Sequence, residues 1–225
     1  DIVLVLQKYE TKLAKENIRD LVDNIRILNN KIGITSTIND YVGKYGIVFR
    51  GSSMTAAPSL IQGNEIKVGI PTFSSAGFDV TGVRIEDRNP NLVIRYNYIH
   101  DIINNTTSTN NTTGFVVGLR LFGTNNTNID INNNIIRDVI SARKQTTLGN
   151  AANYGVYMVN FGSIKFNHNT LGLIVPNTTG ATASPVSCGV FVVNGNLQEY
   201  KNNVLVNNNS SPRAFCIGTN GATIA

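Results

Sequence analysis

An internal repeat constrains the fold of this chain more than any other feature of the sequence. Six segments share the pattern apolar-x-x-Asn-x-apolar, and their asparagines recur about every 35 residues. These asparagines are Asn30, Asn64, Asn97, Asn134, Asn169 and Asn203. A fixed period of roughly 20 to 50 residues is typical of proteins in which one small unit stacks on copies of itself.

A second motif, Gly-apolar-x-apolar, comes before the asparagine motif of the later repeats. Its glycines are Gly46, Gly82, Gly118, Gly155 and Gly189. We take Ala214, at the start of "AFCI" (214–217), as a sixth member in which alanine replaces glycine. Two motifs in a fixed order with one period are far harder to obtain by chance than one motif in an asparagine-rich chain.

Each period contains apolar segments of only three or four residues, separated by polar corners. Strands this short do not form a stable sheet alone, but they do when each pairs with its equivalent one period away. The sequence therefore predicts an all-β fold, a parallel β-helix solenoid of about six coils over residues 25–225. A leucine-rich repeat has a shorter period, and a helical solenoid needs a 3.6-residue pattern.

The segment "INNNII" (131–136) shows what the asparagines are expected to do. We predict that Asn132 faces outward, that Asn133 lies in the bend and that Asn134 points into the corner. Stacked side-chain amides bond to one another along an axis, so Asn134 should bond to Asn97 and Asn169. We also expect this last asparagine to turn the chain, because asparagine tolerates left-handed backbone geometry.

Over residues 25–217 these motifs resemble the right-handed parallel β-helix of the pectate-lyase-like superfamily. The resemblance, together with the general preference for right-handed crossovers, predicts a right-handed coil. It also implies an alternative activity, because members cleave acidic polysaccharides by β-elimination or hydrolysis. The best catalytic constellation for a lyase or hydrolase is Arg84, Asp87, Arg88 and Arg120. The paired aspartates and the Gly-His-Gly signature of polygalacturonase-like members are absent from the sequence.

The N-terminal residues 1–24 follow a different pattern. Residues 1–6 are strand-like, and residues 7–24 have the apolar spacing of an amphipathic helix. We predict an N-terminal cap of one strand and one helix, because a cap would cover the open end of a solenoid. The alternative is a helical insertion between coil strands.

Residues at the x position of the glycine motif should point outward. In this alignment the outward column reads Val48, Arg84, Arg120, Tyr157, Phe191 and Cys216. Arg84, Arg120, Tyr157 and Phe191 would then form an exposed ribbon that binds glycans, since aromatic faces stack on sugar rings and arginines pair with carboxylates. The alternatives are lateral packing of these side chains and a contact face for another subunit.

Four long polar segments enter at one point of the period: 71–81, 104–113, 141–153 and 176–187. Insertions at one position of a repeat protrude from the same flank of a solenoid, where they often form a binding face. The alternative is a set of tolerated surface loops.

Composition narrows the classes of partner. Apolar residues make up 41% of the chain and charged residues only 15%, so polarity comes mainly from the amides and hydroxyls of its many asparagines and threonines. The net charge is +5, but lysine and arginine are spread along the chain, which argues against a nucleic-acid partner. Acidic residues are too scattered for a predicted metal site, and we predict no cofactor. No apolar run is long enough for a membrane span.

The two cysteines are Cys188 and Cys216. In this alignment they lie on neighbouring coils about three residues out of step, roughly 10 Å along a strand, which is beyond disulfide reach.

These features together favour a non-catalytic module of an extracellular or cell-surface protein, acting as a stalk, adhesin or glycan-binding segment. Its partner would be a polysaccharide or cell-surface glycan. The alternatives are the polysaccharide lyase or hydrolase described above and a structural protein that self-associates into fibres. The abrupt ends of the chain favour a segment of a longer protein.

Overall fold

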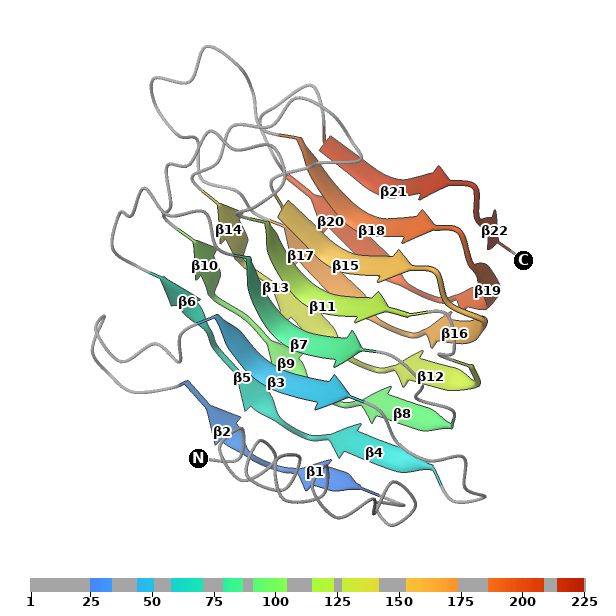
Figure 1. The fold of residues 1–225 in the computed structure, drawn as a ribbon. Coiled ribbons are helices and arrows are strands. Elements are labelled where there is room, and N and C mark those ends of the chain that lie inside the picture. The colour runs from blue at the N-terminus through green and yellow to red at the C-terminus, as the bar shows by residue number, and fades with distance from the viewer. Residues whose placement is uncertain are drawn as a thin grey trace.

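The chain folds as a parallel β-solenoid (Figure 1). The computed structural model describes residues 25–33, 44–50, 58–70, 79–86, 91–104, 115–123, 127–141, 153–173, 186–208 and 214–224. The predicted N-terminal strand and helix, together with Asp87 and Arg88, lie outside these ranges. The described residues form strands and connections only, and they contain no helix long and apolar enough to cross a membrane.

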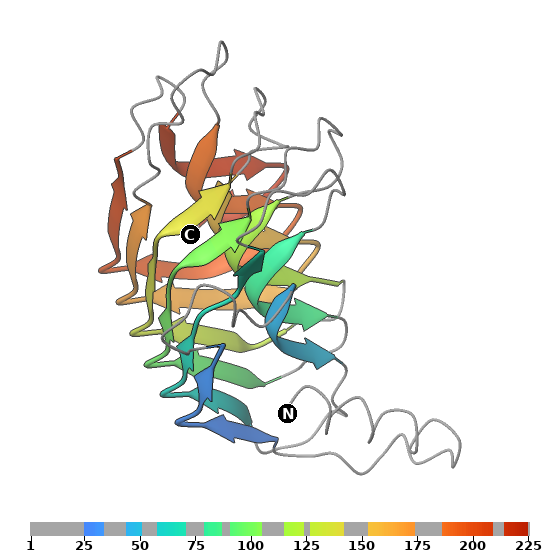
Figure 2. The ribbon, with the colours of Figure 1, turned by 90° about the vertical axis from the view of Figure 1, so that its left-hand side faces the viewer.

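Four parallel sheets make up the walls of the solenoid (Figures 1 and 2). Sheet A contains β1 (Arg26–Leu28), β4 (Ser59–Gln62), β8 (Leu92–Arg95), β12 (Ile129–Asn132), β16 (Ser163–Asn167), β19 (Asn196–Lys201) and β22 (Thr223–Ile224). Sheet B contains β2 (Lys31–Ile32), β5 (Glu65–Ile66), β9 (Tyr98–Ile99), β13 (Ile135–Arg137), β17 (Thr170–Leu173) and β20 (Val204–Asn207). Sheet C contains β3 (Tyr45–Arg50), β7 (Val80–Glu86), β11 (Val116–Phe122), β15 (Asn153–Val159), β18 (Ser187–Val193) and β21 (Ala214–Asn220). Sheet D contains β6 (Gly69–Ile70), β10 (Ile102–Asn104) and β14 (Val139–Ser141).

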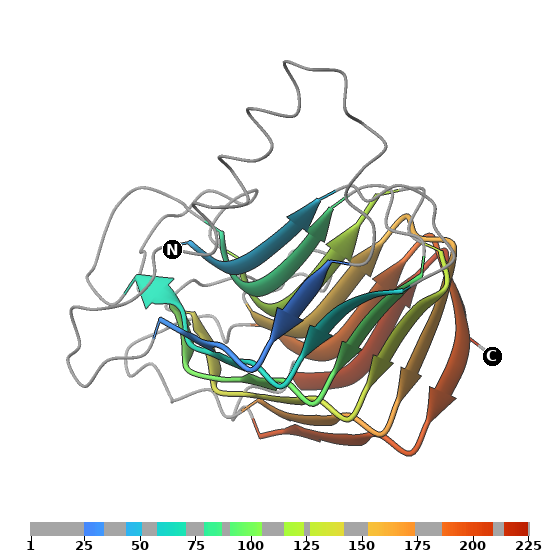
Figure 3. The same ribbon diagram turned by 90° about the horizontal axis from the view of Figure 1, so that it is seen from below.

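The chain passes through these sheets in a fixed order, so that each strand pairs with its equivalent in the next turn (Figure 3). About three turns, from β4 to β15, carry a strand in all four sheets. The predicted all-β parallel solenoid is therefore confirmed. Its interior is filled by apolar side chains that stack turn over turn, as Ile61, Ile94 and Ile131 do in sheet A.

The predicted stack of asparagines is present between sheets A and B. We call Asn30, Asn64, Asn97, Asn134, Asn169 and Asn203 the amide ladder. In every step from Asn30 to Asn169, the backbone N–H and the side-chain Nδ2 of one asparagine both donate to the Oδ1 of the asparagine one turn later, at 2.9 to 3.2 Å. From Asn64 onward, Nδ2 also donates to a strand carbonyl in the preceding turn at 2.9 Å. The four central members are at most 1% exposed, so these buried amides are satisfied by one another and by the backbone.

The bend itself is not made by the ladder asparagines, and that prediction is wrong. The residue immediately before each ladder asparagine has the left-handed backbone conformation. These residues are Asn29, Gly63, Tyr96, Asn133, His168 and Asn202, with φ between 53° and 68°. One residue thus turns the chain, and the next residue forms the stacked amide. Asn133 lies in the bend and Asn132 on the outward side of β12, as predicted.

The glycine motif marks a point in sheet C where adjacent turns approach closely. A Cβ atom added to Gly118 would lie 2.7 Å from the carbonyl oxygen of Gly155 and 2.4 Å from Cγ2 of Ile136. Gly46, Gly82 and Gly155 have the same close approach to the carbonyl oxygen one turn later, at 2.6 to 2.7 Å. Glycine is required here because each turn places its backbone where the side chain of the preceding turn would be.

The sixth glycine motif lies two residues later than predicted. Cys188 pairs with Phe215 and Val190 pairs with Ile217, so Cys216 rather than Ala214 lies opposite Gly189. Cys216 belongs to β21, the last strand of sheet C, where no described strand lies above it. The requirement for glycine is therefore relaxed at this position.

The amide ladder predicts a large cost for Asn134→Ala. The substitution would leave the N–H of Asn97 and the carbonyl of Ile94 buried without their partner, so the free energy of unfolding should fall by about 3 kcal/mol. Urea denaturation measures the change. Asn132→Ala is the control, since its outward side chain accepts a hydrogen bond from the exposed Asn133 amide alone among the described residues. An equal fall in the free energy of unfolding of both variants would show that the amide ladder does not stabilise the fold.

The close approach at the glycine column predicts that Gly118→Ala destabilises the fold by about 2 kcal/mol, because backbone atoms must move to admit the methyl group. Gly172→Ala is the matched control in β17, where the nearest atom to the added Cβ is Arg137 Cβ at 3.7 Å. Thermal unfolding should show a lower midpoint for Gly118→Ala alone. A similar midpoint for the two variants would mean that the turns separate easily at this column.

Candidate functional site

The outward face of sheet C carries the side chains that the sequence predicts to bind glycans. The strand register aligns Val48, Arg84, Arg120, Tyr157 and Phe191 in one column. The last member is Gly218, which lies opposite Phe191, and not Cys216 as the shifted sixth motif predicts. The column is therefore correct over five turns and wrong at the sixth.

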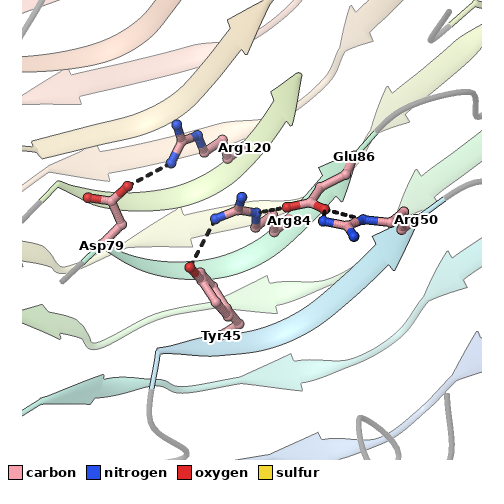
Figure 4. A network of polar contacts seen from close by, with 6 residues as sticks. All are labelled: Tyr45, Arg50, Asp79, Arg84, Glu86 and Arg120. Carbon is pink, nitrogen blue, oxygen red and sulfur yellow. Dashed lines mark hydrogen bonds and ion pairs between the residues drawn. The ribbon is translucent and has the colours of Figure 1, made fainter. Parts of the chain in front are cut away.

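A network of charged groups crosses this face (Figure 4). Arg84 donates from Nε to the carboxylate of Glu86 and from a terminal nitrogen to the Tyr45 hydroxyl at 3.0 Å. Arg50, from the preceding turn, donates to the same Glu86 carboxylate. The Glu86 side chain is only 3% exposed, so this charge is stabilised by two arginines from adjacent strands.

Arg120 is held in a similar way by a different acid. One terminal nitrogen of Arg120 donates to Asp79 at 3.0 Å, and Asp79 also accepts the backbone N–H of Phe115 at 3.2 Å. The Nε atom of Arg120 is buried, and no described residue accepts a hydrogen bond from it. Arg84 and Arg120 thus each have a carboxylate partner from their own chain, and Asp79 does not use the buried Nε of Arg120.

Aromatic rings alternate with these arginines across the turns. The Arg84 guanidinium lies 4.9 Å from the Tyr45 ring centre and 4.8 Å from that of Phe122. The Arg120 guanidinium lies 5.3 Å from Phe122 and 5.7 Å from Tyr157. These are cation–π distances. We call Tyr45, Arg84, Phe122, Arg120 and Tyr157 the arginine–aromatic stack.

The members of the predicted ribbon differ in exposure. The side chains of Arg84 and Arg120 are 18% and 19% exposed, and Tyr157 is partly buried. Burial raises the pKa of the Tyr157 hydroxyl, although nearby Arg120 lowers it. Phe191 is only 2% exposed, so the expectation that its ring is exposed is wrong.

Phe191 belongs to a second apolar cluster, which is separate from the interior core. The buried members of this cluster are Val117, Tyr154, Val186, Cys188 and Phe191. The Phe191 ring lies parallel to that of Tyr157, with centroids 5.8 Å apart. Lateral packing, the alternative considered for this column, therefore describes Phe191.

Half of the proposed lyase constellation lies together. Arg84 and Arg120 are direct partners in the register of β7 and β11, while Asp87 and Arg88 lie outside the described residues. The acids that the structure brings to these arginines are Glu86 and Asp79.

Sequence reasoning gave Tyr45, Arg50, Asp79, Glu86 and Phe122 no part in this site. Two of them carried a usable signal. Glu86 lies two residues after Arg84 and hence on the same face of the strand, and Arg50 lies opposite Glu86 in the register.

The two histidines lie apart. His100 is buried beside Tyr98, with ring centroids 4.0 Å apart, and its Nδ1 lies 2.8 Å from Asp101. His168 occupies a bend and contacts Asn202 at 3.1 Å. Within the described ranges, no group of three or more His, Cys, Asp or Glu side chains is arranged to hold a metal ion.

Comparison of the chain with protein-family models, with curated proteins and with solved structures finds no significant match.

The cysteines are both free thiols, as expected, but the three-residue offset predicted from the internal repeats is wrong. Cys216 lies opposite Gly189, so it is one residue out of step with Cys188 rather than three. Cys188 is buried and Cys216 is exposed. Burial raises the pKa of the Cys188 thiol to about 12, and Cys216 adds to the effect.

We therefore expect the native chain to react with a thiol reagent at Cys216 only. The thiolate is the reactive form, and at about pH 8 a thiol with a strongly raised pKa is fully protonated. Titration with a chromogenic disulfide reagent should give one rapid thiol per native chain and two after unfolding in denaturant. Cys216→Ser should abolish the rapid reaction. Rapid modification of both cysteines in the native state would contradict the burial of Cys188.

Proposed function

We propose that the chain is a non-catalytic glycan-binding module of an extracellular or cell-surface protein. The observation that supports this proposal is the arginine–aromatic stack, which presents partly exposed rings and guanidinium groups over four successive strands of sheet C. Aromatic faces suit the apolar faces of sugar rings, and guanidinium groups donate to their oxygens. The regular spacing of the turns suits a polymer better than a single small ligand.

The charges of the network favour a glycan of mixed character. Among the described residues, three guanidinium groups contact two carboxylates, an excess of one positive charge. The Arg120 side chain is 19% exposed and can donate to an acidic group or a hydroxyl of the ligand. A strongly anionic polymer would be repelled by the charges of Glu86 and Asp79 and attracted by those of the arginines. Affinity is therefore expected to depend on ring contacts as much as on charge.

The finer description of the fold belongs to the same proposal. We propose six right-handed coils related to the pectate-lyase-like superfamily, with residues 1–24 as an N-terminal cap. The six parallel strands of sheets B and C support the number of coils. The strong general preference for right-handed crossovers between parallel strands supports the handedness.

Self-association is a second candidate, favoured by the last described turn. Ile217 and Ile224 continue the interior columns of sheets C and A, yet they are 42% and 38% exposed. The strands β21 and β22 each pair on one side only among the described strands. A second copy that covers this end would bury the apolar side chains, and sedimentation at increasing protein concentration would show the assembly.

The glycan proposal is tested with Arg120→Ala and Tyr157→Ala on a carbohydrate array and by calorimetry. Saturable binding of an acidic or mixed polysaccharide is expected for the native chain, with about a ten-fold loss in each variant. Arg95→Ala is the matched control, because Arg95 also lies over a ring, Tyr96 at 5.7 Å, but on sheet A. Its affinity should be unchanged.

Two outcomes would overturn the proposal. Equal affinity of Arg95→Ala, Arg120→Ala and Tyr157→Ala for the glycan would remove the stack as the binding site. Growth of unsaturated-sugar absorbance on a uronate polymer would instead favour the lyase, with Arg84, Asp87, Arg88 and Arg120 as its residues.

A further inference from the structure

A depression of about 300 Å³ lies on the outward face of sheet A, away from the arginine–aromatic stack. Its polar lining comes from four successive turns, at or near the starts of β8, β12, β16 and β19. The lining polar residues are Asn91, Asn128, Asp130, Ser163, Lys165 and Gln198. This volume is at the small end of the range for ligand sites, so it suits one small ring rather than a large cofactor.

A β-bulge creates one wall of the depression. Ile164 pairs with Leu197, but the next residue, Lys165, pairs with Glu199, so Gln198 is an extra residue in β19. Leu197 is buried, whereas Gln198 is exposed and lines the depression. Bulges redirect a side chain out of the regular ladder and are frequent beside functional sites. The repeat is thus interrupted where the outward face is hollowed.

One rim of the depression is held by hydrogen bonds within the chain. The backbone N–H of Asn128 donates to Ser163 Oγ at 3.1 Å, and Asn128 Nδ2 donates to Asn91 Oδ1 at 3.2 Å. Asn91 and Asn128 both have left-handed backbone conformations, which fixes the corner from which they project. A site whose polar groups are already oriented loses less conformational entropy when it binds.

Two polar groups remain for a ligand. Asp130 and Gln198 make no hydrogen bond or ion pair in the described part of the chain, while Lys165 is held at 3.0 Å by Glu199. The Asp130 carboxylate accepts hydrogen bonds only, the Gln198 amide donates and accepts, and the Lys165 ammonium donates. The depression therefore offers both donors and acceptors around a space the size of one ring.

We propose that this depression binds an uncharged sugar unit through its hydroxyl groups. Adjacent hydroxyls of a pyranose would donate to the two oxygens of Asp130, and a neighbouring hydroxyl would exchange hydrogen bonds with Gln198. Because Asp130 and Lys165 carry opposite charges and act on each other, an anionic or a cationic ligand gains little net attraction, whereas a neutral ring with several hydroxyls can bond to both groups. The site is separate from the arginine–aromatic stack and takes a ligand of different charge.

The test uses the full chain labelled with ¹⁵N and titrated with methyl glycosides of neutral hexoses. A binding sugar should shift the backbone amides of Asn128, Asp130 and Gln198 saturably, together with the Gln198 side-chain NH₂. Asp130→Asn keeps the shape but removes the charged acceptor, and it should weaken binding by about ten-fold. Gln198→Ala should weaken it several-fold, because one hydrogen-bonding group is lost.

Lys201→Ala is the matched control, since Lys201 is a 66% exposed side chain on the same strand outside the depression. Its affinity for the sugar should be unchanged. The proposal is overturned if no neutral glycoside shifts these amides, or if Asp130→Asn and Lys201→Ala bind equally. Binding by Arg120→Ala should be intact, so failure of the stack and failure of this site are distinguished.

Discussion

The amide ladder is the interaction on which the rest of the solenoid depends. A corner between two short strands leaves backbone groups that no strand pairing satisfies, and in a dry interior each would cost free energy. In the central steps of the ladder, each asparagine solves this problem for its own turn and for both neighbours. Its Oδ1 accepts from the preceding turn, and its Nδ2 donates in both directions along the stack. The strands of sheet B are very short, and the hydrogen bonds of the adjacent corner add to those of their strand pairing.

The glycine column has a complementary effect in sheet C. The ladder holds adjacent turns together at one corner, and the glycines allow them to approach closely on another wall. Together they fix the register, so that an outward residue in one turn lies beside its equivalent in the next. This is why guanidinium groups and rings from separate turns alternate as a stack, and why Lys165 meets Glu199. Packing in the interior fixes the spacing between adjacent turns, whereas the outward side chains can vary in chemistry.

The sequence predicted those parts of the structure that every turn must repeat. Asn134 and Gly118 could be recognised because their equivalents face the same constraint in adjacent turns. Asn133 was placed in the bend correctly, but the bend residues of the other turns could not be recognised, because the bend requires a backbone conformation and no particular side-chain contact. Gly63, Tyr96 and His168 all serve there, which leaves no common residue type to detect. The last turn was misaligned for a related reason, since Cys216 is the one position in its column with no described strand above it.

On the outward faces, some residues depart from the repeat, and packing in the interior does not explain them. Gln198 adds a residue between Leu197 and Tyr200, but the spacing of Asn169 and Asn203 is still 34 residues, so other segments of that turn absorb the insertion. Glu86 and Phe122 occupy equivalent outward positions with opposite chemistry, and each contacts Arg84. The interior of a solenoid requires equivalent residues of successive turns to be alike. Outward residues do not pack in the interior, so equivalent outward positions can differ in chemistry. They are therefore the positions where the surface can be specialised for a ligand, and both proposed sites are built from them.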